Sequence, residues 1–243
     1  MTHRELSPVR VRRGFSFQSV EAAPGVQVET IPPDLEGSSL SSATVQLFPN
    51  VEWPLEAGED DVLVYAVSGR GQLGEVALSG GTAVRLGRGE AGTVRTGSQP
   101  LQLLVFRCAA SCDEHAPLGP AQRSAHVDLG SLDAATSGRE FQVLFDMYNG
   151  STRATLFLGK VPPGAAPWHF HQYDEIVWIL EGHGLYHLAG GEEEFEAGSA
   201  FRVRPREVHI VENASSEPML LLGVFTPAGS PAAAFLASDP RRR

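Results

Sequence analysis

Apolar and polar residues alternate with a period of two along much of this chain, the pattern of strands with one buried face. Segments of this kind include 26–30 and 141–146, and the apolar runs at 176–180 and 220–225 are short enough to be buried strands. No segment shows sustained helical periodicity, and only one short helical turn is expected, at 232–236. The pattern therefore predicts an all-β protein.

The strand pattern occurs twice. Three segments of the first half have counterparts in the second: 43–47 and 154–158, 61–71 and 174–184, and 80–86 and 197–203. Residues 116–138 between the two copies are linker-like, with proline and glycine. The sequence therefore predicts two related units, at 1–115 and 139–243, joined by this linker.

Composition and charge exclude several function classes. The chain has 243 residues, of which 42% are hydrophobic and 20% charged, as expected for a folded globular protein. The net charge of −10 makes nucleic acid a poor partner. No apolar run approaches the roughly 20 residues of a membrane helix, so no membrane association is expected. The N-terminal segment lacks the apolar stretch of a signal peptide, which predicts a cytoplasmic protein.

The candidate chemistry gathers in a short stretch of the second unit. His169 and His171 share one face of a strand because their positions differ by two, and Glu175 begins the next strand after a polar turn. His209 lies further along the chain, in a second polar segment. Two imidazoles and a carboxylate, with a third imidazole, form a mixed nitrogen and oxygen site for a borderline divalent metal.

This arrangement resembles the cupin superfamily. The first cupin motif is similar to Gly164, His169-x-His171, Glu175 and Gly182, and the second to Gly198, His209 and Asn213. Arg204 and Arg206 stand where the second motif has proline and glycine. The resemblance implies two small antiparallel jelly-roll-type β-barrels in tandem, with His169, His171, Glu175 and His209 around a metal in the second barrel.

Aligning the two copies indicates what the first one has lost. Glu56 falls opposite His169, and Gly58, Val62 and Gly92 fall opposite His171, Glu175 and His209. Apart from Glu56, these residues offer no side chain that can bind a metal. One divalent ion per chain is therefore expected, in the C-terminal unit.

The resemblance also implies a function. A metal-dependent enzyme acting on a small oxygen-bearing molecule is expected, with an Fe(II) dioxygenase of the quercetinase kind as the first choice and Glu175 as ligand and proton acceptor. A non-redox isomerase, lyase or decarboxylase using Mn, Ni or Zn is the alternative. A third reading, from another class, is a module that binds or senses a small ligand without turnover.

Substrate contacts are predicted at Arg202, Arg204 and Tyr186. Arg202 and Arg204 share one face of a strand and would suit a carboxylate if that face lines the barrel, whereas the opposite orientation would leave them in solvent. Alternation alone does not decide between these orientations. Tyr186 has two readings as well, as part of an aromatic rim or of the core.

Two further features concern the contacts between the units. Because Glu175 must point inward, Ile176, Trp178 and Leu180 are expected to point outward, and such an apolar row requires cover. The other barrel would supply it, or a second chain in a homodimer. Cys108 and Cys112 form a C-x-x-x-C near the linker, which we interpret as two reduced thiols, with a disulfide or a second metal site as alternatives.

Overall fold

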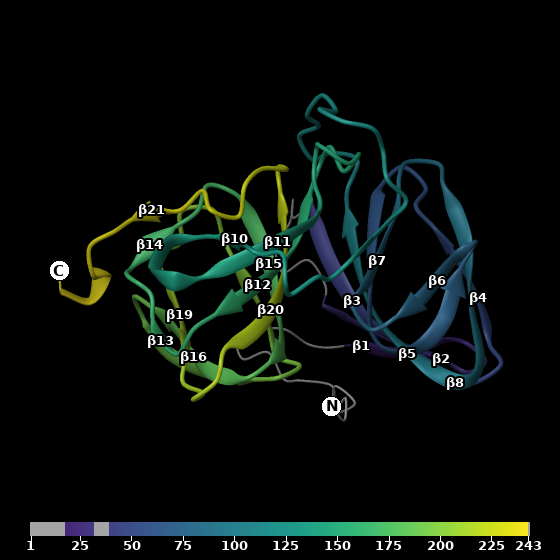
Figure 1. Ribbon diagram of the computed structural model, residues 1–243, viewed down its shortest axis with the longest axis horizontal. Helices are drawn as coiled ribbons and strands as arrows, with labels where there is room; N and C mark the ends of the chain where they lie inside the picture. The colour runs from purple at the N-terminus through teal and green to yellow at the C-terminus, as the bar shows by residue number, and fades with distance from the viewer. Residues whose placement is uncertain (1–17, 32–38, 243) are drawn as a thin grey trace.

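The computed structural model describes residues 18–31 and 39–242, and these form two β-barrels side by side (Figure 1). The described residues contain no α-helix, only two short 3₁₀ turns, Thr136–Gly138 and Pro240–Arg242. The predicted all-β class and the two barrels are thus confirmed. Within the described part of the chain, no helix is long and apolar enough to cross a membrane.

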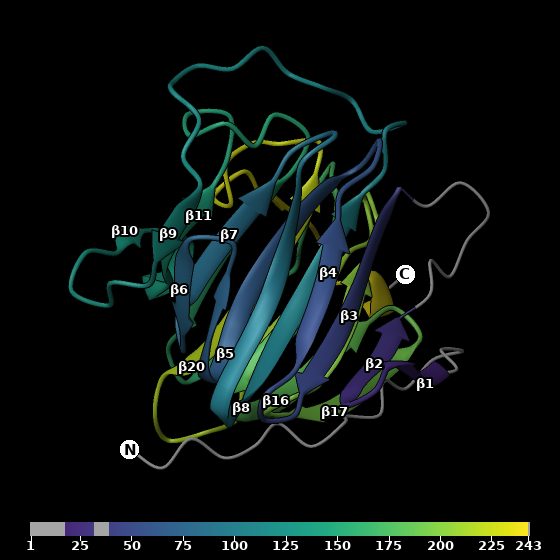
Figure 2. The same ribbon diagram turned by 90° about the vertical axis from the view of Figure 1, so that its right-hand side faces the viewer.

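The N-terminal barrel is one nine-stranded antiparallel sheet in the order β1-β2-β3-β8-β5-β7-β9, with β4 paired to β8 and β6 to β5 (Figure 2). Its strands are β1 (Gln18–Ala23), β2 (Val26–Ile31), β3 (Leu40–Leu47), β4 (Glu52–Glu56), β5 (Asp61–Leu73), β6 (Val76–Ser79), β7 (Thr82–Leu86), β8 (Ala91–Cys108) and β9 (Ser124–His126). Strand β9 comes from the segment expected to be a linker and pairs with β7.

The C-terminal barrel packs a six-stranded sheet, β10-β11-β12-β20-β15-β18, against a four-stranded one, β13-β19-β16-β17, and adds the pair β14-β21. The strands are β10 (Asp133–Ala134), β11 (Glu140–Phe145), β12 (Thr155–Val161), β13 (Gly164–Ala165), β14 (His169–Phe170), β15 (Asp174–Glu181), β16 (His183–Leu188), β17 (Gly191–Glu196), β18 (Ala200–Val203), β19 (Ile210–Asn213), β20 (Met219–Thr226) and β21 (Phe235–Leu236).

The helical turn expected at 232–236 is wrong, because β21 lies there instead. Phe235 pairs with Phe170 across the short ladder, and their rings stack with centroids 5.3 Å apart. Pairing with a neighbouring strand therefore decides the conformation of this segment, where the sequence carries little periodicity of its own.

The two barrels share a core. Its buried residues come from β3, β5, β7 and β8 on one side and from β11, β12, β15, β18 and β20 on the other. Trp178 belongs to this core with 3% of its surface exposed, and its indole N–H donates to Ser42 Oγ of the N-terminal barrel over 3.2 Å. The outward apolar row predicted on β15 is thus covered by the other barrel of the same chain.

Candidate metal centre

Short backbone contacts bring the three predicted histidine ligands together. His169 of β14 forms a β-bridge with His209. The backbone N–H of His169 donates to the carbonyl of His209, and that of His209 to the carbonyl of His169, with N to O distances of 3.2 and 2.9 Å. The turn before His209 contains Arg206, whose φ of 64° lies in the left-handed region that favours glycine. Its N–H donates to the carbonyl of His171 over 2.6 Å. The turn is thus formed with arginine where the cupin motif has glycine.

The three imidazoles converge on one point. One nitrogen from each of His169, His171 and His209 lies within 4.8 Å of the other two, the sole cluster of three such side chains within residues 18–31 and 39–242. Glu175 Oε2 lies 3.9 Å from His171 Nε2. Behind it, a Cβ on Gly223 would lie 2.2 Å from the Phe157 ring and 3.0 Å from Glu175 Oε1, so glycine leaves the room that this carboxyl occupies.

Backbone contacts orient two of the rings. His169 Nδ1 lies 2.9 Å from the carbonyl oxygen of Pro167, and His209 Nδ1 lies 2.8 Å from that of Glu207. A carbonyl can only accept, so each Nδ1 carries the proton and each Nε2 presents a lone pair. A fixed tautomer of this kind is typical of histidines that bind a metal.

Burial keeps all three imidazoles neutral. It lowers the pKa of His171 to about 4 and that of His209 to about 3, and it lowers the pKa of His169 as well. Burial also raises the pKa of the enclosed Glu175 carboxyl to about 8. Three neutral imidazoles and a carboxyl that releases its proton to a cation form a donor set that fits a borderline divalent metal.

The centre opens into a cavity of about 390 Å³. Its walls are mainly apolar side chains of the C-terminal barrel: Phe141, Phe157, Val161, Val177, Val203, Val211 and Leu221. Residues 228–237, which we call the strap, border the same space and contribute Pro231, Ala232, Ala234 and Leu236. Arg139, directly before β11, also lines it.

The predicted substrate contacts lie elsewhere. Glu175 pairs with Val203, which lines the cavity, so Arg202 points to the opposite face of β18. There its Nε lies 3.0 Å from Asp174 Oδ1 and its Nη2 donates to the carbonyl of Leu40, in the N-terminal barrel. Arg204 is exposed. Tyr186 stacks on Phe201 with ring centroids 4.4 Å apart and belongs to the core of the barrel.

In the N-terminal barrel, aliphatic side chains surround the positions that align with the candidate ligands. Val62, which aligns with Glu175, is fully buried among aliphatic side chains. A Cβ on Gly92, opposite His209, would lie 2.8 Å from Leu73 Cδ1. Glu56 is exposed at the end of β4. Packing thus takes the place that the ligand cluster has in the C-terminal barrel.

Known families and folds agree with this architecture. Residues 157–225, which include all four candidate ligands, match the family described as Cupin domain. Residues 157–225 therefore form a cupin domain within this chain. Among solved structures, AerE from Microcystis aeruginosa is similar over 87% of this chain and 97% of its own, with 14% identity and a TM-score of 0.69. A comparison with curated proteins finds no match.

Two further solved structures share this fold. A point mutant of Bacillus subtilis oxalate decarboxylase OxdC is similar over 90% of this chain and 77% of its own, with 14% identity and a TM-score of 0.70. The formate complex of Lactobacillus farciminis oxalate decarboxylase covers 91% and 86%, with 13% identity and a TM-score of 0.67. At these identities the likeness concerns the fold.

Proposed function

We propose that the C-terminal barrel binds one divalent metal through His169, His171, His209 and Glu175 and converts a small carboxylate with an apolar body. The observation that carries this proposal is the joint presence, around one apolar cavity, of the ligand cluster and the guanidinium of Arg139. The bound metal would supply a Lewis acid that withdraws electrons from a coordinated substrate oxygen.

Arg139 is the charged group that selects the substrate. Its Nη2 donates to the carbonyl of Val211 over 2.9 Å, and burial lowers its pKa. Within the described part of the chain, no carboxylate lies at ion-pair distance from it, whereas nearby Lys160 has Glu140 at 2.7 Å. A half-buried guanidinium without an anionic partner is costly, and a substrate carboxylate would compensate it with two charge-assisted hydrogen bonds.

The other lining residues determine the rest of the ligand. Apolar walls exclude water and favour an aliphatic or aromatic body over a second charged group. Glu175 borders the same space, where its carboxyl can hold or release a proton. These properties suit a decarboxylation, elimination or isomerisation of a carboxylate. Two of the cupins that share this fold are named oxalate decarboxylases, which supports this class over the Fe(II) dioxygenase.

The test begins with metal analysis of the purified full chain and reconstitution with Mn, Fe, Ni or Zn. Each form is offered a panel of carboxylates, from oxalate to aryl- and alkyl-substituted 2-oxo acids, while CO₂ release, product NMR and oxygen uptake are recorded. We expect turnover of an apolar carboxylate without oxygen consumption. Oxygen uptake in proportion to product would establish the dioxygenase instead, and binding without product would establish a sensor.

Matched arginine variants test the role of Arg139. Arg139→Gln should raise KM by about 10- to 100-fold, the effect of losing a charge-assisted pair. Arg204→Gln removes the same group from an exposed position and should leave KM unchanged. Equal effects of the two substitutions would contradict the proposed anchor.

A further inference from the structure

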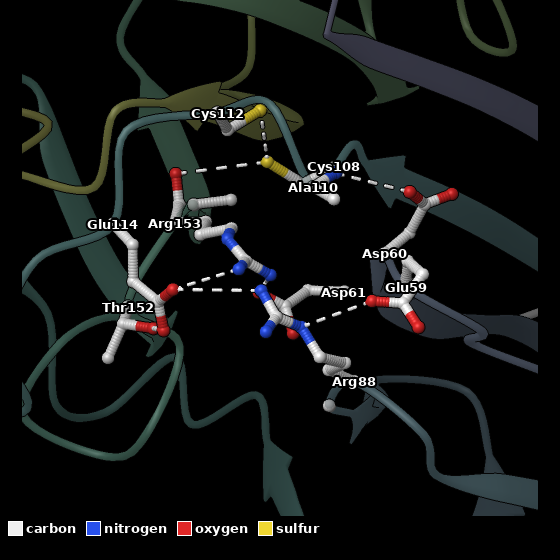
Figure 3. Close-up of polar contacts among 12 residues, drawn as sticks. Glu59, Asp60, Asp61, Arg88, Cys108, Ala110, Cys112, Glu114, Thr152 and Arg153 are labelled. Atoms are coloured by element: carbon white, nitrogen blue, oxygen red, sulfur yellow. Dashed lines mark hydrogen bonds and ion pairs between the residues drawn. The ribbon is translucent and has the colours of Figure 1, made fainter.

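Two cysteines meet where the two barrels join (Figure 3). Cys108 is the last residue of β8, and Cys112 follows one turn later. Their Sγ atoms lie 2.8 Å apart, and both residues are free thiols. A disulfide bond is about 2.05 Å long, so the two sulfur atoms need to move closer by less than about 1 Å to form one.

The surroundings hold the pair in place. Cys108 Sγ lies 3.7 Å from Thr226 Oγ1 and 3.9 Å from the carbonyl of Arg153, both in the C-terminal barrel. Cys112 Sγ lies 3.4 Å from the carbonyl of Ser39. The turn itself is closed by a hydrogen bond from the N–H of Cys112 to the carbonyl of Ala109, over 3.0 Å. Contacts from both barrels therefore hold the two sulfur atoms close together.

A metal does not explain the pair. His115 lies three residues beyond Cys112 but is exposed, and among the residues with described positions the His169 cluster alone brings three metal-binding side chains together. Two thiols without a third ligand make a poor site for zinc. Two adjacent thiols can, however, be oxidised to a disulfide.

We propose that Cys108 and Cys112 are a site of reversible oxidation that forms an intramolecular disulfide. With hydrogen peroxide as oxidant, the Cys112 thiolate attacks one oxygen and breaks the O–O bond, giving a sulfenic acid and hydroxide. The Cys108 thiolate then forms the S–S bond and displaces the second hydroxide. Overall, two thiols and one peroxide become a disulfide and two waters, and a dithiol reductant reverses the reaction.

The order of attack follows from access and charge. Cys112 retains 8% exposure and follows the exposed Ala110 and Ser111, whereas Cys108 has 2%. The Cys108 S–H donates to Cys112, which lowers the pKa of the Cys112 thiol to about 6 and raises that of Cys108. Cys112 is therefore the thiolate that meets the oxidant, and Cys108 resolves the sulfenic acid.

The disulfide would close a short loop beside the junction between the barrels. Next to it, the buried Arg153 lies 3.3 Å from Asp61 of the N-terminal barrel and 2.8 Å from Glu114 beyond the turn (Figure 3). Closing a loop from 108 to 112 limits the unfolded chain, so oxidation should raise the melting temperature, by about 5 °C from the loop-closure relation.

The experiment treats the full chain with stoichiometric hydrogen peroxide and follows thiol titration under denaturing conditions, intact mass and melting temperature. We expect both thiols to disappear, the mass to fall by about 2 Da with no added oxygen, and dithiothreitol to restore the starting state. The Cys108→Ser variant should stop at a sulfenic acid that a dimedone probe traps on Cys112. The Cys108→Ala/Cys112→Ala double variant should show no change in melting temperature on oxidation.

Three results would each overturn the proposal. The first is both thiols remaining titratable after the oxidant, the second is a mass gain in steps of oxygen, and the third is a disulfide between two chains. A change in melting temperature that the double variant also shows would mean that oxidation acts elsewhere.

Discussion

Substitutions at Trp178 measure how strongly the two barrels depend on each other. The indole is buried in the core that both barrels share, and its N–H donates to Ser42 Oγ, which is itself buried. Trp178→Phe removes the hydrogen bond and little of the packing. Trp178→Ala also removes the ring, and Trp178→Glu adds a charge to a core of apolar side chains.

The magnitudes follow from these contacts. Trp178→Phe should cost about 1–2 kcal/mol, because a buried hydrogen bond is lost and Ser42 loses its donor. Trp178→Ala should cost about 3–5 kcal/mol for the lost ring and the cavity that remains. Trp178→Glu should cost more, because a buried carboxylate without a partner is the most expensive change of the three. A loss of that size is a large share of the roughly 5–15 kcal/mol that stabilises a domain.

Urea unfolding of the metal-free chain, followed by circular dichroism, provides the measurement. The midpoint should fall in the order Phe, Ala, Glu, and an unchanged slope would show that the same surface is exposed on unfolding. Trp168→Ala is the matched control, because that residue is only partly buried and lies outside the shared core. A Trp178→Ala protein within about 0.5 kcal/mol of wild type, or a soluble and equally stable Trp178→Glu protein, would refute this account.

Three further outcomes are expected. His209→Ala should lower the metal content measured by mass spectrometry, and full occupancy would place the ion elsewhere. Metal uptake at pH 6.5 should release a proton from Glu175, because the pKa of that carboxyl is raised to about 8. The affinity for the metal should therefore increase with pH up to about 8. Calorimetry in two buffers measures the proton release, which Glu175→Gln should abolish. Arg153→Met leaves Asp61 without its buried partner and should cost about 3–5 kcal/mol in thermal unfolding, and an unchanged melting temperature would show the pair to be dispensable.

Local patterns in the sequence predict much of this architecture. Alternation and the internal repeat indicate two strand-rich units, and the ligand spacing indicates the four side chains of the candidate centre. Alternation also shows that Arg202 and Arg204 share a face. Which face it is depends on the pairing of Glu175 with Val203, a contact between strands far apart in sequence.

Arg139 and the strap were missed for a related reason. Arg139 is a single arginine beside a Ser-Gly turn, and its spacing from the histidines follows no motif. The strap has little periodicity, and it reaches the cavity because β21 pairs with β14 and Ala237 N–H donates to the carbonyl of Trp168 over 2.8 Å. Both depend on long-range packing, and the available signals were only an isolated charge and an apolar C-terminal segment.

The pairing of the strap with β14 links the rate at which small molecules leave the cavity to the rate at which the ion is lost. Leu236 of the strap lies opposite His169, so the strand that carries a candidate ligand is held by the strap on one side and by His209 on the other. Any opening of the strap that widens the cavity removes one of these supports. Variants that loosen the strap should therefore exchange small molecules faster and also lose their metal ion faster. Faster release from the cavity thus comes with weaker retention of the metal.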